Sequence, residues 1–340
     1  MTIILDFLKL AILPGGLFVL VGGLLYEWVD RKLVAQLQNR IGPRWFQPFA
    51  DVIKLMAKEE VVPAGPAPRL LVMRGKRDGH VQFRVEPEDN SPFLFVYLPV
   101  LALGAALTAV ISVPMAGLAP LASYQGDLVV TIYLLSVVTM SLALAGSNTY
   151  DRFSLLGATR TLTQLFSYEA PFLLALLGPA IISGSWQISR IAEYGQTHWW
   201  FILTQPVGFV IAIIGLMGKV EMPPFDAPEA ETEIVSGALT EYSGRGWALF
   251  RLAKSAELMV GLTLIATLYL GGMTSSAWPW AGPLIFLVKT LALLAVVAGL
   301  QVLTTRFRID QTARYWRYGA LILLLQMIVL VVLQMTGVKL

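Results

Sequence analysis

Eight stretches of the chain are long and apolar enough to cross a lipid bilayer, because about 20 mostly apolar residues span its hydrocarbon core as a helix. They cover residues 8–26, 93–115, 128–145, 162–182, 201–220, 248–270, 284–303 and 315–335. Only 14% of the 340 residues are charged, whereas soluble domains carry about a quarter. A charged segment follows the first stretch, which indicates a retained span rather than a cleaved signal. The sequence therefore predicts an all-α, polytopic membrane protein with a single membrane domain over residues 1–340.

The distribution of Lys and Arg predicts how these spans are oriented. The connections after the first, third, fifth and seventh spans, with their borders, hold 21 of the 25 cations. The other side has Lys9, Arg190 and Lys339, and Lys289 lies within a span. Cytoplasmic connections carry the excess of positive charge. We therefore expect both termini on the outer side of the cell inner (plasma) membrane, and we expect the lipid bilayer rather than nucleic acid as a partner.

The first cytoplasmic connection, residues 27–92, is too long to be a simple turn. Phe46, Phe49, Ile53 and Met56 recur at helical spacing between charged residues, which predicts an amphipathic helix in the membrane interface. The charged stretch from 74 to 90 contains an alternating polar and apolar run, which favours a hairpin or an extended loop. On the outer side, residues 188–200 are expected to form a short surface helix.

An acidic cytoplasmic connection, residues 219–246, contains five carboxylates within thirteen residues. They are Glu221, Asp226, Glu229, Glu231 and Glu233. Three prolines at 223, 224 and 228 prevent a regular helix through the first half of this segment. The simplest interpretation is a solvated acidic loop. A divalent cation bound by the last four carboxylates is an alternative, although the spacing of an EF-hand is absent.

Ionisable residues also lie inside the predicted spans. Glu169 falls in the fourth span and Lys289 in the seventh, and Arg251, Lys254 and Glu257 share one face of the sixth. Ionisable groups at membrane depth are costly and typically mark ion or proton pathways. Structural ion pairs between helices are the alternative for Glu169 and Lys289.

The chain contains no cysteine and only two histidines. Without cysteine it cannot supply thiolate ligands to iron–sulfur clusters or zinc. His80 lies in a polar segment and His198 beside two tryptophans, so neither is placed to bind haem within the membrane. We expect no cofactor, catalytic residue or metal site on this chain.

The acidic connection resembles a family signature. The run PFDAPEAETEIVSG from Pro224, closed by TEYS from Thr240, is similar to the signature of the H subunits of respiratory complex I, the mitochondrial ND-one type. Further similarities cover the chain: RIGP from Arg40 with QPFADVIK from Gln47, DRFSLLG with SYE before 170, and RFRIDQ from Arg306.

The resemblance implies a membrane subunit that anchors a hydrophilic redox arm and conveys electron transfer to ion pumping. Partners would be iron–sulfur and large catalytic subunits and antiporter-like membrane subunits, with iron–sulfur clusters and a nickel–iron centre or quinone in the complex. It assigns proton or ion coupling to Glu169, Glu221, Asp226, Glu229, Glu231, Glu233, Glu241, Glu257 and Lys289. It assigns the arm interface, or a loop like that of the quinone chamber, to Arg40, Gln47, Asp51, Lys54 and Arg160.

Two departures bear on the branch of the family. Lys219 and Met222 stand where complex I subunits usually carry Glu and Arg, and the loop between Pro43 and Gln47 is shorter. Both features are more similar to membrane-bound, energy-converting nickel–iron hydrogenases and ferredoxin-linked complexes. A stand-alone secondary transporter and a purely structural anchor are the rival functions. No counterpart of residues 224–244 occurs in the other half, as a transporter repeat would require.

Overall fold

The computed structural model describes residue 12 and residues 15–60, 70–77, 80–86, 93–149, 151–272 and 281–335. Its main helices are α2 (Gly16–Leu37), α3 (Gln47–Ala57), α4 (Phe93–Ala109), α5 (Asp127–Ser147), α6 (Arg152–Ser183), α7 (Ile188–Thr197), α8 (Pro206–Lys219), α9 (Glu231–Ile234), α10 (Gly244–Tyr269), α11 (Ala281–Leu303) and α12 (Ile309–Met335). Strands β1 (Leu70–Arg77) and β2 (His80–Glu86) form an antiparallel hairpin. Apart from this hairpin, the regular elements of the described residues are helical, as the sequence predicts.

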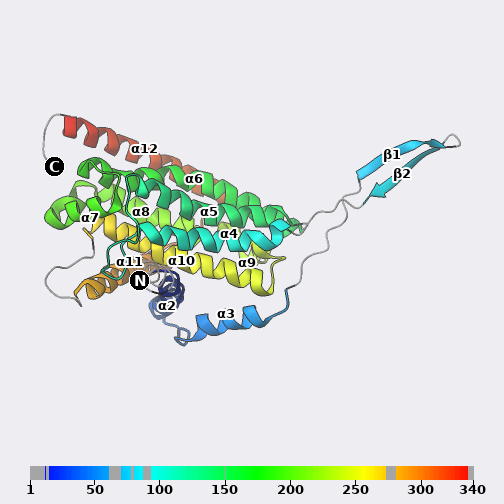
Figure 1. Ribbon diagram of the computed structural model, residues 1–340, viewed down its shortest axis with the longest axis horizontal. Helices are drawn as coiled ribbons and strands as arrows, with labels where there is room; N and C mark the ends of the chain where they lie inside the picture. Colours follow the sequence, from blue (N-terminus) through cyan, green and yellow to red (C-terminus); the bar gives the residue numbers. More distant parts are fainter. Residues whose placement is uncertain are drawn as a thin grey trace, which may run out of the picture.

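Helix α10 is the central element of the bundle (Figure 1). Every residue from Ser255 to Tyr269 is buried, and α10 contacts α2, α3, α4, α5, α6, α7, α8 and α11. Small residues allow close packing at two of these contacts. Gly23 of α2 lies against the backbone of Ser255, and Gly261 lies against Leu216 of α8. Glu257, the charged residue within this buried stretch, is therefore held inside protein and not in lipid.

Five helices of the described chain are long and apolar enough to span a membrane. They are Leu94–Ser112, Asp127–Ser147, Arg152–Ser183, Ala281–Leu303 and Ile309–Met335. The remaining three predicted spans coincide with α2, with α8, which has only 14 residues, and with α10, which carries four charged residues. The protein is thus a polytopic membrane protein, whereas the count of eight spans and their orientation stay predictions.

Helix α12 presents a broad apolar face outward. Leu321, Ile322, Leu325 and Ile328 are each more than half exposed, and among its buried residues are Trp316 and Leu323. Exposed apolar surface of this extent is unfavourable in water. It is suited to contact with lipid or with other membrane subunits.

Contacts between connecting segments agree with the prediction that successive connections lie on opposite sides of the membrane. Arg160 at the start of α6 binds Glu233, and Arg306 before α12 binds Asp226, so the third, fifth and seventh connections meet at one end of the bundle. At the other end, the Ile188 amide donates to Asp127 Oδ1 at 2.8 Å. These contacts agree with the prediction for the connections that they join, and the orientation of the termini stays a prediction.

The first long connection contains both elements that its pattern predicts. Helix α3 packs Val52 and Phe49 against Leu24 and Leu252, while Ile53 on its other face is 68% exposed. The β1–β2 hairpin stands apart from the helices in Figure 1. Helix α7 likewise matches the predicted short helix near residues 188–200.

Candidate functional site

The acidic segment, residues 219–246, folds as short turns and helices across the end of the bundle. A 3-10 turn at Ala227–Glu229, α9 and a second turn at Gly237–Leu239 follow one another. Gly237 has a φ of 54°, and a Cβ there would lie 2.0 Å from the Pro228 carbonyl oxygen. Only glycine therefore fits this position, which closes the segment back on itself.

Two arginines fix the segment to neighbouring connections. Arg306 binds Asp226 through both carboxylate oxygens, Nε to Oδ1 at 2.7 Å and Nη2 to Oδ2 at 2.5 Å. Arg160 binds Glu233 Oε2 at 2.7 Å and donates to the Ala227 carbonyl at 3.2 Å. The fork geometry of a guanidinium holds each contact in a defined orientation. The acidic segment is thus an ordered part of the fold and not a free solvated loop.

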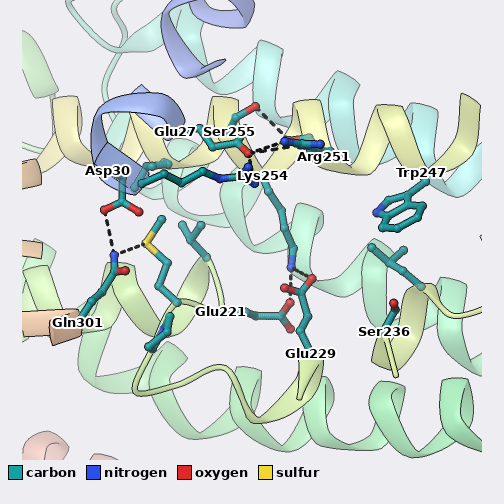
Figure 2. A pocket seen from close by; sticks show the side chains of 16 residues that line it. Glu27, Asp30, Glu221, Glu229, Ser236, Trp247, Arg251, Lys254, Ser255 and Gln301 are labelled. Atoms are coloured by element: carbon teal, nitrogen blue, oxygen red, sulfur yellow. Dashed lines mark hydrogen bonds and ion pairs between the residues drawn. The ribbon is translucent and has the colours of Figure 1, made fainter. Parts of the chain in front are cut away.

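Lys254 of α10 joins two carboxylates of the acidic segment (Figure 2). Its Nζ lies 2.5 Å from Glu221 Oε2 and also binds Glu229 Oε1. The Glu221 side chain is only 1% exposed, whereas that of Glu229 is 39% exposed. Burial raises the pKa of the Glu221 carboxyl, and Lys254 acts against that rise. One ammonium therefore links a carboxylate at the surface to one inside the protein.

A second cluster lies on the other side of Lys254. Arg251 Nη2 is 3.0 Å from both Glu27 Oε1 on α2 and Asp51 Oδ2 on α3. Asp30 of α2 accepts a hydrogen bond of 3.0 Å from Gln301 of α11. These contacts tie α2, α3, α10 and α11 together around one cavity.

The cavity has a volume of about 380 Å³. Sixteen residues line it, and Figure 2 shows Glu27, Asp30, Glu221, Glu229, Arg251 and Lys254 around it. With Arg31, seven of the sixteen are ionisable. Pockets for apolar ligands are lined mainly by apolar and aromatic side chains. This cavity combines its ionisable side chains with apolar ones such as Leu239, Trp247 and Leu258.

A partly buried ion pair lies deeper in the bundle. Lys219, the last residue of α8, has a fully buried side chain and binds Glu169 Oε2 of α6 at 3.3 Å. Ser136 of α5 accepts from Lys219 at 2.8 Å and donates to Glu169 Oε1 at 2.5 Å. In the sequence, Lys219 was noted as a cation that borders the fifth connection and as a departure from the family pattern, and not as a buried group. Its place in the last turn of an apolar span was the signal that could have identified it as a buried partner of Glu169.

Glu257 of α10 lies between these groups. It is 1% exposed and lines one narrow crevice with Lys219, Glu221 and Lys254. Its Oε1 has no hydrogen-bond partner among the described residues. The structure therefore brings together Glu169, Glu221, Glu229 and Glu257, four of the residues assigned to coupling.

Three further residues that the resemblance assigns to coupling, Lys289, Glu241 and Glu231, do not belong to this group of four carboxyls. Lys289 of α11 donates to the carbonyls of Leu270 at 2.6 Å and Gly272 at 2.8 Å, at the C-terminal end of α10. That end is 13 residues, or about 20 Å of helix, beyond Glu257. Lys289 thus caps a helix, and the structure does not pair it with Glu169. Glu241 has a buried Oε2 without a hydrogen-bond partner among the described residues. The Glu231 side chain lies outside the described part of the chain.

The residues assigned to the arm interface lie around α3. Arg40, Gln47 and Lys54 are exposed, and Asp51 binds Arg251. Arg160 lies apart from them, on α6. Exposed polar groups of this kind are available to a partner subunit, and the contact of Asp51 connects their helix to α10.

The proposed alternative of a divalent cation lacks a converging ligand set. Asp226, Glu229 and Glu233 bind three different basic side chains. Within the residues that the structure describes, no three His, Asp or Glu side chains converge on a possible metal position. The carboxylates of the acidic segment are thus engaged by Arg and Lys.

Comparisons with known proteins identify clear relatives. The family model described as NADH dehydrogenase matches residues 10–74 and 81–332. The H subunit of NADH-quinone oxidoreductase from Carboxydothermus hydrogenoformans is 33% identical over 328 residues, which cover 92% of this chain and 85% of that protein. The H subunit of F(420)H(2) dehydrogenase from Methanosarcina mazei is 32% identical over 323 residues, with 88% and 85% covered. The fold matches a chain of the membrane-bound sulfane sulfur reductase, an archaeal respiratory membrane complex, with a TM-score of 0.81, 23% identity, and 96% and 99% coverage.

Proposed function

The chain belongs to the NADH dehydrogenase family of respiratory H subunits, the ND-one type, and from this premise we propose that it anchors a hydrophilic redox arm to the membrane and couples electron transfer to ion translocation. The relatives are named as subunits of NADH-quinone oxidoreductase and F(420)H(2) dehydrogenase. In this proposal the isolated chain has no catalytic activity of its own. Iron–sulfur and large catalytic subunits carry the electrons, and antiporter-like membrane subunits move the ions.

The observation that carries the coupling role is the series of charged residues leading inward from the acidic segment. Glu229 at the surface shares Lys254 with the buried Glu221. Glu257 lines the next crevice, and the Lys219 pair with Glu169 follows. These six groups come from α6, α8, α10 and the acidic segment. A change at the surface thus has a physical route into the membrane part of the fold.

Electrostatics explains how such a series transmits a change. Charges interact more strongly in a protein interior than in water, because the effective dielectric constant is lower. If electron transfer in the redox arm alters the charge or position of the acidic segment, Lys254 must redistribute its contact between Glu221 and Glu229. That redistribution changes the electrostatic potential at Glu257 and at the ion pair of Lys219 with Glu169. The carboxyls can then take up or release protons in response.

The partner subunits are proposed to bind at the end of the bundle where the acidic segment and α3 lie. The exposed side chains of Arg40, Gln47 and Lys54 belong to this region. The excess of Lys and Arg in these connections predicts that this end faces the cytoplasm, where soluble redox subunits would bind. The apolar outer surface of α12 is available for lipid or neighbouring membrane subunits.

Two branches of the family remain candidates for this chain. The named relatives favour a quinone-reducing complex. The presence of Lys219, where complex I subunits usually carry Glu, favours the hydrogenase-like or ferredoxin-linked branch. Quinone reduction by the purified complex decides between them.

The coupling proposal is tested by Glu229→Gln and Glu231→Gln in the whole complex. Each variant should lower the number of ions translocated per two electrons. Glu193→Gln, which removes an exposed carboxylate on α7, is the matched control. Wild-type ion-to-electron ratios in both test variants would contradict the proposal.

Purification tests the anchoring role against a stand-alone transporter. An affinity-tagged chain extracted in mild detergent should be recovered together with iron–sulfur and antiporter-like subunits. Recovery of the chain alone, or as a homo-oligomer that transports ions, would favour the transporter.

A further inference from the structure

Lys219 lies near carboxyls of two different helices and binds one of them. Its Nζ is 3.3 Å from Glu169 Oε2 on α6. Glu257 on α10 lines the same crevice, is almost fully buried, and has an Oε1 without a hydrogen-bond partner among the described residues. Lys219 thus binds the carboxyl of Glu169 and shares a crevice with the carboxyl of Glu257.

The surroundings of the ammonium permit it to move. Its Nζ lies 5.3 Å from the ring centres of both Tyr168 and Phe172. Aromatic faces attract a cation without the directional demand of a hydrogen bond. The contact with Ser136 is a hydroxyl that can rotate. A lysine ammonium on its flexible stem can therefore change partners while it stays over the two rings.

The series of charged residues that leads inward from the acidic segment contains four carboxyls and two ammonium groups. Lys254 serves Glu221 and Glu229, and Lys219 serves Glu169. Glu257 is the carboxyl without an ammonium of its own. A buried carboxylate without a counter-charge is unfavourable at membrane depth, so the carboxyl that lacks the ammonium is the one that holds a proton.

We propose that Lys219 is a two-position charge switch whose ammonium alternates between Glu169 and Glu257. When the ammonium moves to Glu257, that carboxyl releases its proton and Glu169 takes up one proton. The total charge is unchanged, and one proton passes from α10 to α6. This inference rests on the coupling role proposed above and identifies the residue that performs one step of it.

The decisive variant is Lys219→Met combined with Glu169→Gln, which removes both charges of the pair and leaves neither residue unpaired. A static structural pair can be replaced in this way without functional loss. The switch predicts that the assembled complex translocates fewer than half as many ions per two electrons as the wild type. A wild-type ratio in the assembled double variant would overturn the switch.

Infrared difference spectra of the complex, oxidised minus reduced, give a second readout that a structural role would not affect. The switch predicts two carboxyl bands of opposite sign, one from a carboxyl that loses its proton and one from a carboxyl that gains a proton. Both bands should be absent in Glu257→Gln, because the ammonium then has no second carboxylate to join. Loss of only one of the two bands in Glu257→Gln would overturn the switch, and this comparison does not need the double variant to assemble.

The coupling role and the switch can fail separately. If Glu229→Gln lowers the ion-to-electron ratio while the Lys219→Met/Glu169→Gln complex keeps it, coupling stands and the switch is overturned. If Glu229→Gln and Glu231→Gln both keep the wild-type ratio, the coupling proposal itself is overturned.

Discussion

Arg306 and Asp226 are 80 residues apart in the chain, and their side chains form a two-point contact, with Nε–Oδ1 at 2.7 Å and Nη2–Oδ2 at 2.5 Å. The contact joins the acidic segment to the residues that precede α12. The Phe307 amide also donates to the Pro224 carbonyl at 3.0 Å. The position of the acidic segment therefore depends on the connection between α11 and α12.

Arg306→Lys should loosen the acidic segment without removing charge, because an ammonium cannot form the two parallel hydrogen bonds of a guanidinium. The Arg306 side chain is 36% exposed, so the expected loss is only about 1 kcal/mol. Hydrogen exchange of the backbone around residues 225–230 should become about fivefold faster. Arg317→Lys on the exposed side of α12 is the control. Equal exchange in Arg306→Lys and wild type would contradict the proposed anchoring.

Gly157→Ala should displace the acidic segment from α6. A Cβ at Gly157 would lie 2.3 Å from the Ala238 amide nitrogen and 2.5 Å from the Gly237 carbonyl carbon, and both are backbone atoms that cannot rotate away. We expect a loss of about 1–3 kcal/mol in stability, measured as a lower thermal midpoint of the purified complex. Gly104→Ala on α4 meets nothing within 4 Å. It should be neutral or stabilising by about 0.5–1 kcal/mol, and an equal loss in both variants would contradict the close contact.

Hydropathy and charge located the helices well, because the bilayer imposes length and composition on each span. Glu169, Lys254 and Glu257 were recognised as buried groups for the same reason. Their partners could not be deduced, since pairs such as Asp226 with Arg306 depend on how distant connections meet. Lys289 is the clearest example of what the sequence could not predict. Its position within a predicted span suggested a role in coupling, whereas in the structure its ammonium binds backbone carbonyls at the end of α10. Only the three-dimensional packing distinguishes a lysine that binds carboxylates, such as Lys254, from one that binds backbone carbonyls, such as Lys289.

The pH dependence of stability should change in Glu221→Gln. Burial raises the pKa of Glu221 above its ordinary value of 4.5. Between that value and its raised pKa, the folded protein holds more protons than the unfolded chain, so the contribution of Glu221 to stability falls as pH rises. The thermal midpoint of the wild type should therefore fall relative to that of Glu221→Gln as pH rises above 4.5. A midpoint difference that rises with pH, or that does not depend on pH, would contradict the effect of burial.

The predicted orientation can be measured by labelling single cysteines, because the wild-type chain contains none. Glu193→Cys lies on α7, on the predicted outer side, and Asp310→Cys lies on the predicted cytoplasmic side, and both positions are exposed. A membrane-impermeant maleimide should label Glu193→Cys in intact cells and Asp310→Cys only in inverted vesicles. Labelling of both from the same side would contradict the alternation of spans.

The central claim is that the charged series conveys electron transfer to ion movement through Lys254, the residue shared by Glu221 and Glu229. The most direct test is the number of ions translocated per two electrons by the complex carrying Lys254→Gln, reconstituted in sealed vesicles. Arg317→Gln removes one exposed positive charge and serves as the control. We expect the ratio to fall severalfold in Lys254→Gln and to stay at the wild-type value in Arg317→Gln. A wild-type ratio in an assembled Lys254→Gln complex would contradict the coupling role of the series.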